Sequence, residues 1–505
     1  MSEIKNNEKN IDNPPVKEEI KKPEDHKKQE DMGNNLDRMR STGGASLEAK
    51  TAQSRILETP KQKEIKENKA KNVDVQDKKT TIGSKLENLS SAGTVKEKEH
   101  SEKNRLEKAD GVKEITKPYY EDAKELAQKS EVGSCFTDHT EAHVEQVEKK
   151  SREAANALEK AIQNGKFQKE SDDPDHIQFV GDVDKDVLSA AALSHDTGMR
   201  GDGYAVRTYK ENGEIQFVKD ADGKIIVDEV DNKDFDQVRS NHSLNSAINI
   251  LADREKYKEL GYTDEQVDMM AAECMAHSKS SSGVQNLNSR KDWEKCFDCI
   301  DSAWDQYKKD HPGDYVDFDR TRFENDDKKL GQLATATLAL RVGDVSRDSG
   351  PEAKSQSGEE IHVNRETIND AGGSIKNEVG SAEVTKGNPH KKLDLPEDKL
   401  TKAKQVHIGE QNITENHTIC KEDGTVVHEI RVNDGTSAPA CTAEAISDHI
   451  GEFESAKGAE FTIEVTFDKP CASDKEKQAY EDLRDKVEAK PDNNITIIYP
   501  WDKED

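Results

Sequence analysis

Apolar residues are spread unevenly along this chain, and their spacing divides it into regions. Residues 1–112 carry only isolated apolar side chains with no regular period, and the first aromatic residue is Tyr119. Such a segment buries too little surface to offset the entropy of ordering it. We therefore predict a disordered, charged tail over residues 1–112, in which a coiled-coil or partner-binding helix remains an alternative.

The middle of the chain has the pattern of a helical domain. Apolar residues recur at helical spacing from Val144 to Ile162 and from Val187 to Leu193. Further helical patterns cover 241–259, 263–279, 291–309 and 327–347. Between them, residues 203–230 contain three β-prone runs separated by Asn212-Gly213 and Asp222-Gly223, which are hairpin turn sequences. The pattern predicts a mainly α-helical domain over residues 113–350 with a β-meander inserted at 203–230.

The last part of the chain changes pattern twice. Residues 351–404 are polar and rich in Gly and Ser, which is typical of a linker. Residues 405–505 then predict a small α/β module. Its expected elements are two strands around Asp423-Gly424, a helix near 440–455, a strand at 461–467, a helix at 473–488 and a strand at 495–499.

The distribution of charge along the chain limits the kinds of partner that the protein is expected to bind. The first 110 residues hold 24 basic and 22 acidic side chains, while the whole chain holds 76 and 105. The remainder therefore has 52 basic and 83 acidic residues, a net charge of −31, which disfavours binding to duplex nucleic acid. A small phosphorylated substrate remains compatible with this charge if a cation occupies the site. A protein partner for the tail or the C-terminal module also remains possible.

Localisation follows from what the sequence lacks. No apolar run approaches the roughly 20 residues that span a bilayer, and the polar start predicts no signal peptide. Seven cysteines, an odd number, do not form a disulfide framework. We expect a cytoplasmic protein without a membrane partner. Cys296 and Cys299 have metal-site spacing, but no second pair accompanies them, so we expect them to pack in the core.

Metal-ligand residue types fall on or at the ends of the predicted helices. His139 and His143 are four residues apart and share a helix face. The adjacent His195 and Asp196 end an apolar helix, where they are costly unless they pair or bind an ion. The other candidates are His242, His277 at the end of an apolar run, and Asp344 inside an apolar helix.

The order of these residues resembles the HD superfamily of metal-dependent phosphohydrolases. The likeness covers residues 130–350 and consists of His143, the pair His195-Asp196, and the distant Asp344 in an Asp-Val-Ser-Arg context. It implies an α-helical bundle in which these four residues hold one divalent ion. It also implies a second ion, bridged by Asp196 and held by His242 and His277. His139 would then be an outer ligand or would orient a ligand.

The resemblance implies hydrolysis of a phosphate ester, in a nucleotide or cyclic nucleotide, by a metal-activated water. Asp196 would orient or deprotonate that water. Mixed His and carboxylate ligands suit Mn, Fe, Ni or Zn, with Mg as a further possibility. By adjacency to the ligands, Lys279, Arg200 and Arg347 are candidates to contact phosphate oxygens, with Lys279 in a catalytic role.

Two other interpretations remain open. The domain can be a ligand sensor or scaffold that keeps its metal and binds protein partners without turnover. Alternatively, the helical region is a packed bundle whose histidines and aspartates do not converge. If the helical region is only a packed bundle, the side chains of His143, His195, Asp196 and Asp344 lie apart in the structure.

Overall fold

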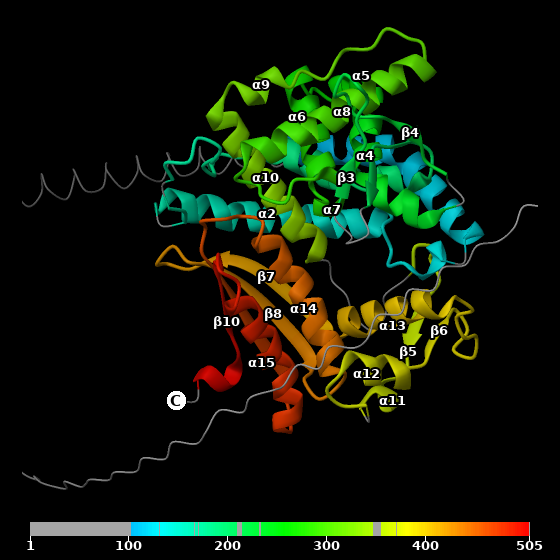
Figure 1. The fold of residues 1–505 in the computed structure, drawn as a ribbon, viewed down its shortest axis with the longest axis vertical. Coiled ribbons are helices and arrows are strands. Elements are labelled where there is room, and N and C mark those ends of the chain that lie inside the picture. Colours follow the sequence, from blue (N-terminus) through cyan, green and yellow to red (C-terminus); the bar gives the residue numbers. More distant parts are fainter. Residues whose placement is uncertain are drawn as a thin grey trace, which may run out of the picture. The chain divides into compact units, whose positions relative to one another are not determined.

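The computed structural model describes residues 103–130, 132–165, 167–169, 171–209, 215–231, 234–346, 355–369 and 371–503. Within these residues the protein is mainly α-helical, with short β-strand pairs after the third helix and a small sheet near the C-terminus (Figure 1). This confirms the predicted fold class. The predicted tail lies outside the described residues as far as residue 102.

The helical region begins earlier than residue 113, because residues 103–129 lie in one helix. Arg105 is buried there and pairs with Glu148 at 2.8 Å. Ala109 and Val112 follow at helical spacing and are also buried. The prediction of a tail was wrong for residues 103–112, because the partner of Arg105 lies in a different helix that no local pattern reveals.

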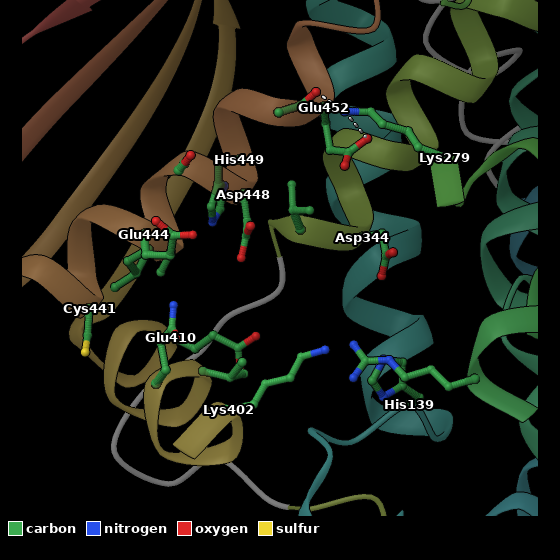
Figure 2. Close-up of a pocket in the computed structure, with 18 residues that line it drawn as sticks. His139, Lys279, Asp344, Lys402, Glu410, Cys441, Glu444, Asp448, His449 and Glu452 are labelled. Carbon is green, nitrogen blue, oxygen red and sulfur yellow. Dashed lines mark hydrogen bonds and ion pairs between the residues drawn. The ribbon is translucent and has the colours of Figure 1, made fainter. Parts of the chain in front are cut away.

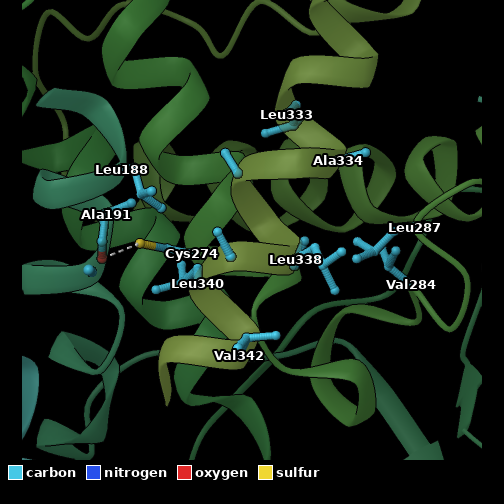
Figure 3. Close-up of a cluster of buried hydrophobic side chains, with 14 of the residues drawn as sticks. Leu188, Ala191, Cys274, Val284, Leu287, Leu333, Ala334, Leu338, Leu340 and Val342 are labelled. Atoms are coloured by element: carbon cyan, nitrogen blue, oxygen red, sulfur yellow. Dashed lines mark hydrogen bonds between the residues drawn. The ribbon is translucent and has the colours of Figure 1, made fainter. Parts of the chain in front are cut away.

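The helices of the central region surround one long buried helix, α10 (Asp327–Val345). Nearly every residue of α10 from Leu330 to Gly343 is buried, as expected for a helix covered on all sides. Figure 3 shows Leu338, Leu340 and Val342 among the apolar side chains of this core. The other elements are η1 (Gly133–Cys135), α2 (Glu141–Gln163), α3 (Lys185–Ser194), η2 (Thr197–Arg200), α4 (Phe235–Ala252), α5 (Arg254–Glu259), α6 (Asp264–Ala276), α7 (Lys279–Ser282), α8 (Arg290–Asp310) and α9 (Thr321–Glu324).

The predicted β insertion at 203–230 is confirmed as two antiparallel pairs. Strand β1 (Tyr204–Ala205) pairs with β4 (Asp228–Glu229), and β2 (Arg207–Tyr209) pairs with β3 (Ile215–Phe217). All four strands are short and separate from the C-terminal sheet. The insertion leaves the helical core continuous, since α4 resumes directly after it.

The segment predicted as a linker is folded over its described residues. It contains β5 (Ile361–Val363), α11 (Arg365–Asn369), α12 (Ile375–Ser381), β6 (Val384–Lys386) and the start of α13 (Glu397–Asn412). Polar contacts hold it in place: the buried Glu378 accepts hydrogen bonds from the backbone N–H groups of Ala440 (3.0 Å) and Cys441 (2.7 Å). The prediction of an irregular linker was wrong because such contacts leave no hydrophobic period in the sequence.

The C-terminal module is a four-stranded sheet in the order β10-β9-β8-β7. β7 and β8 form a hairpin around Asp423-Gly424, and β9 and β10 then add in parallel after the crossover helices α14 and α15. These are the elements that the sequence predicts. Their bounds are β7 (Ile413–Cys420), β8 (Val426–Asp434), α14 (Pro439–Phe453), β9 (Phe461–Lys469), α15 (Asp474–Glu488), β10 (Ile495–Ile498) and η3 (Pro500–Lys503).

The module packs directly on the helical region. The Glu153 carboxylate of α2 accepts a hydrogen bond from the backbone N–H of Thr418 at 2.8 Å, and Lys150 donates to the Asn416 carbonyl. Helix α14 lies against α10, and apolar residues of both regions belong to one buried cluster. α10 therefore carries Asp344 towards the junction between the two regions.

Candidate metal centre

Two groups of metal-ligand side chains converge in the helical region. The first consists of His143, His195, Asp196 and Asp344, and the second of Asp196, His242 and His277. Within each group the ligand atoms lie within 4.8 Å of one another. The structure thus brings together all six residues that the sequence nominated, and the interpretation as a bundle without convergence is wrong. Each group can hold a metal ion.

Helix ends position most of these side chains. His195 is the C-terminal cap of α3 and Asp196 follows it, His277 caps the C-terminus of α6, and Asp344 lies in the last turn of α10. The C-terminus of a helix carries a partial negative charge that favours a nearby cation. Three such ends therefore add to the attraction that the carboxylates exert on a positive ion.

The backbone fixes the orientation of three imidazoles. Nδ1 of His195 lies 2.7 Å from the Ala192 carbonyl, and Nδ1 of His277 lies 2.6 Å from the Cys274 carbonyl. Nδ1 of His242 makes the same contact with the carbonyl three residues before it. A carbonyl oxygen can only accept a hydrogen bond, so Nδ1 carries the proton and donates in each case. The neutral ring then presents the lone pair of Nε2. This is the tautomer that a metal ligand needs.

The two oxygens of Asp196 divide between the groups. Oδ2 lies 3.3 Å from Nε2 of His143 and 3.1 Å from Nε2 of His195. Oδ1 lies 3.3 Å from Nε2 of His242 and 4.0 Å from Nε2 of His277. Asp344 completes the first group, with Oδ1 at 3.3 Å from His143 Nε2 and 3.5 Å from His195 Nε2. Asp196 therefore stands where a carboxylate bridging two ions would stand.

Several buried atoms of these groups lack partners that would satisfy them. Nε2 of His143, Nε2 of His195 and Oδ2 of Asp196 have no hydrogen-bond partner in the described part of the chain. Nε2 of His242 and Nε2 of His277 lie 3.0 Å apart, although both rings donate through Nδ1. Two facing lone pairs repel unless a proton or a cation lies between them. One ion in each group would satisfy all five atoms, so these residues fit a metal.

The charges of the cluster depend on one another. Burial disfavours a charged His195, but Asp196 and then Asp344 outweigh it and raise the pKa of that imidazole well above its ordinary value. Burial likewise opposes ionisation of Asp196, yet the charge of His195 holds the pKa of that carboxyl well below its ordinary range. Burial and the charge of His195 lower the pKa of His277 to about 3. A proton on His195 thus occupies the place of a positive ion, and metal binding must displace it.

Two glycines allow the elements that carry ligands to approach one another. A Cβ at Gly198 would lie 2.0 Å from the backbone oxygen of His242, so η2 and α4 meet only because that atom is missing. A Cβ at Gly343 would lie 2.1 Å from the Ser151 Oγ, where α10 crosses α2. Each glycine is next to, or two residues from, a ligand in the sequence. Their positions help to explain how ligands carried by five helices (α2, α3, α4, α6 and α10) converge in two adjacent groups.

A cavity of about 590 Å³ opens beside the metal-ligand groups. Asp196, His242, His277 and Asp344 form part of its wall. Five cationic side chains also line it, in a protein whose formal net charge is −29: Arg239, Lys279, Arg341, Lys399 and Lys402. Arg341 is fully buried and donates to the carbonyls of Ala276 (2.6 and 2.9 Å) and Val284 (2.8 Å), which fixes the chain on both sides of His277.

Sequence reasoning missed four of these cations, namely Arg239, Arg341, Lys399 and Lys402. Arg239 precedes His242 by three residues on α4, so the same helix periodicity that placed His242 in the site could have found it. Lys402 comes from α13, far along the chain, and no local signal relates it to the metal ligands. Both residues contribute to the wall of the same cavity as Asp196.

Of the other site residues predicted from the sequence, His139 and Lys279 line the cavity and Arg200 does not. His139 lines the cavity beside the ring of His143, with centroids 5.1 Å apart. Lys279 also lines it, but its ammonium donates to the Gly451 carbonyl and pairs with Glu452 at 3.4 Å. Arg200 is not among the residues that line the cavity; its guanidinium lies over the Tyr119 ring, 5.0 Å from the centroid. Arg200 therefore does not share this cavity with Asp196, because adjacency in sequence does not fix the direction of a side chain.

Two further sequence-based predictions concern residues away from the cavity. Arg347 lies outside the described residues. Cys296 and Cys299 are fully buried in the apolar core, as expected for packing residues.

Comparisons with known proteins give no match. No protein-family model, curated protein or solved structure is similar to this chain. Among the described helices, none combines the length and apolar character that crossing a bilayer requires. The function must therefore be argued from the site itself.

Proposed function

We propose that this protein is a metal-dependent phosphohydrolase that cleaves a phosphate ester of a nucleotide or cyclic nucleotide. The observation that carries the proposal is the division of the Asp196 oxygens between two groups of imidazole and carboxylate ligands. Hydrolases with two ions use such a shared carboxylate to keep both ions against one phosphoryl group. The sequence resemblance to HD phosphohydrolases supports the same class of reaction.

The charged residues of the cavity wall support the proposal of a phosphorylated substrate. A divalent ion, when bound, supplies a water of lowered pKa and positive charge against the phosphoryl oxygens. Asp196 would orient the attacking water, and His242 and His277 would complete the second group of ligands. Mixed imidazole and carboxylate ligands favour Mn, Fe, Ni or Zn. Cations in the cavity wall offset the charge of a phosphate ester in an otherwise acidic protein.

The test is hydrolysis by the full-length protein purified with manganese. The substrates are bis-para-nitrophenyl phosphate, para-nitrophenyl phosphate and a panel of nucleotides and cyclic nucleotides. Asp196→Asn keeps the volume of the side chain and removes the bridging charge, so we expect activity to fall by at least a hundredfold. Asp222→Asn changes an exposed turn residue in the same chemical way and should leave activity unchanged.

Metal content, measured on the same samples, separates the outcomes. Activity that requires added metal and is lost in Asp196→Asn supports the proposal. Bound metal without turnover of any substrate would refute hydrolysis and favour the alternative of a metal-retaining sensor or scaffold. If neither metal nor turnover is found, the assignment of the ligand groups is wrong.

A further inference from the structure

The cavity beside the metal-ligand groups continues under the C-terminal module. A second cavity of about 580 Å³ shares with it His139, Arg239, Lys279, Asp344, Lys402 and Glu452. Residues of α13 and α14 form its far wall, as Figure 2 shows for Lys402 and Glu410 on one side and Glu444 and Asp448 on the other. The module therefore encloses the space that a substrate at the metal centre would occupy.

Lys279, one of the three cations nominated by their adjacency to ligands in the sequence, contacts this wall of the cavity. Its ammonium donates to the Gly451 carbonyl and pairs with Glu452, both of α14 (Figure 2). Burial, the main effect on this group, lowers the pKa of Lys279. These contacts tie α7 to α14 and reduce the capacity of Lys279 to attract a substrate anion.

Lys402 differs from Lys279 in its exposure and in its ion pairing. Its side chain is exposed and lines both cavities, and no carboxylate of the described residues forms an ion pair with it. Figure 2 shows its ammonium reaching across the cavity towards His139. The neighbouring Lys399, one turn earlier on α13, is instead paired with Asp236.

Arg239 approaches the same space from the helical region. It lines both cavities, and its guanidinium lies 4.2 Å from the centroid of the Phe136 ring, a contact that holds the planar group in place. Under α14 the wall is acidic, with Glu444 and Asp448, so an anion is favoured only at the end where Arg239 and Lys402 lie. Asp344, one of the metal-ligand residues, lines both cavities together with Arg239 and Lys402.

We propose that Lys402 and Arg239 form a binding subsite for the phosphate oxygens of the substrate, so that α13, the helix that leads into the C-terminal sheet, contributes a residue to the active site. This rests on the proposed function only in identifying the anion as a substrate. Lys402 supplies a mobile point charge, and Arg239 supplies a planar group suited to two phosphate oxygens. The role assigned to both is positioning and binding, and the chemistry remains with the metal-ligand residues.

The first test uses inorganic phosphate as the probe on full-length, manganese-loaded protein, with binding measured by calorimetry. Lys402→Gln and Arg239→Gln should each weaken phosphate binding about tenfold, the effect of losing one charge-assisted contact. Lys402→Arg should restore binding to within about threefold of the wild type. Lys404 lies two residues later on α13 and lines neither cavity. Lys404→Gln removes the same charge and should leave phosphate affinity unchanged.

The second test is kinetic. If the protein hydrolyses a phosphate ester, Lys402→Gln should raise KM about tenfold and change kcat by less than threefold. Equal phosphate affinity in wild type and Lys402→Gln would overturn the proposal, as would an equal loss in Lys404→Gln, which would indicate a general effect of charge. Phosphate binding that depends on Lys402 in a protein without turnover would support the subsite while refuting the hydrolase.

Discussion

Removal of divalent ions is expected to lower the thermal stability of this protein. The perturbation is dialysis against a chelator, followed by return of manganese. Without an ion, the buried Nε2 atoms of His143 and His195 and Oδ2 of Asp196 have no hydrogen-bond partner among the described residues, and Nε2 of His242 and Nε2 of His277 face each other at 3.0 Å. An ion that binds these atoms in the folded state has no comparable site in the unfolded chain, so binding stabilises the folded state.

The size of the effect follows from linkage. A ligand at a hundred times its dissociation constant adds about 2.7 kcal/mol to the free energy of unfolding. Unfolding of about 400 residues, the span from 103 to 503, carries an entropy of roughly 0.8 kcal/mol per kelvin. One bound ion should therefore raise the melting temperature by about 3 °C, and a second ion should add a similar amount. The proton on His195 reduces the shift at low pH, because it competes with the ion.

The measurement is differential scanning fluorimetry at several manganese concentrations, with calorimetry to check reversibility. Asp196→Asn should melt at the same temperature with and without manganese, because both ligand groups lose their shared carboxylate. Asp222→Asn should keep the full shift. A manganese-dependent shift of equal size in Asp196→Asn would refute the assignment of these residues as ligands, and a wild type that does not respond to metal would refute it more directly.

Two other predictions concern the packing around the site. Gly198→Ala should lower the free energy of unfolding by about 1–3 kcal/mol, because the new Cβ would lie 2.0 Å from the His242 backbone oxygen. Urea unfolding tests this against Gly380→Ala, where no atom lies within 4 Å; equal midpoints would contradict the steric argument. Burial and the charge of Asp184 raise the pKa of Glu273 well above its ordinary value, so the folded state holds a proton that the unfolded state releases above about pH 4.5. The stability of the wild type should then fall with rising pH relative to Glu273→Gln, by up to about 1.4 kcal/mol per pH unit until the folded pKa is reached, and a difference independent of pH would contradict this.

The sequence by itself determined most of the elements and the candidate metal-ligand residues. Helices α8 and α10 and the strands β8 and β9 lie close to their predicted positions, because each alternates between buried and exposed positions or is continuously apolar. The ligands were visible because carboxylates and imidazoles in apolar helices are costly without a partner, and Asp196 and His195 were adjacent. The local pattern of apolar residues shows which positions are buried, and the predictions of the elements and of the candidate ligands depended on burial.

Only the tertiary structure decided which side chains share the cavity. Lys402 and Asp196 are about two hundred positions apart, and they line one cavity because α13 is joined to the helical region by contacts such as the Lys399–Asp236 ion pair. Arg200, four residues from Asp196, points instead at Tyr119. The segment predicted as a linker is held by Glu378, whose hydrogen bonds to α14 leave no period in the sequence. Contacts between distant polar groups depend on the direction of each side chain and on the close approach that Gly198 and Gly343 permit, and neither is encoded in local hydrophobicity.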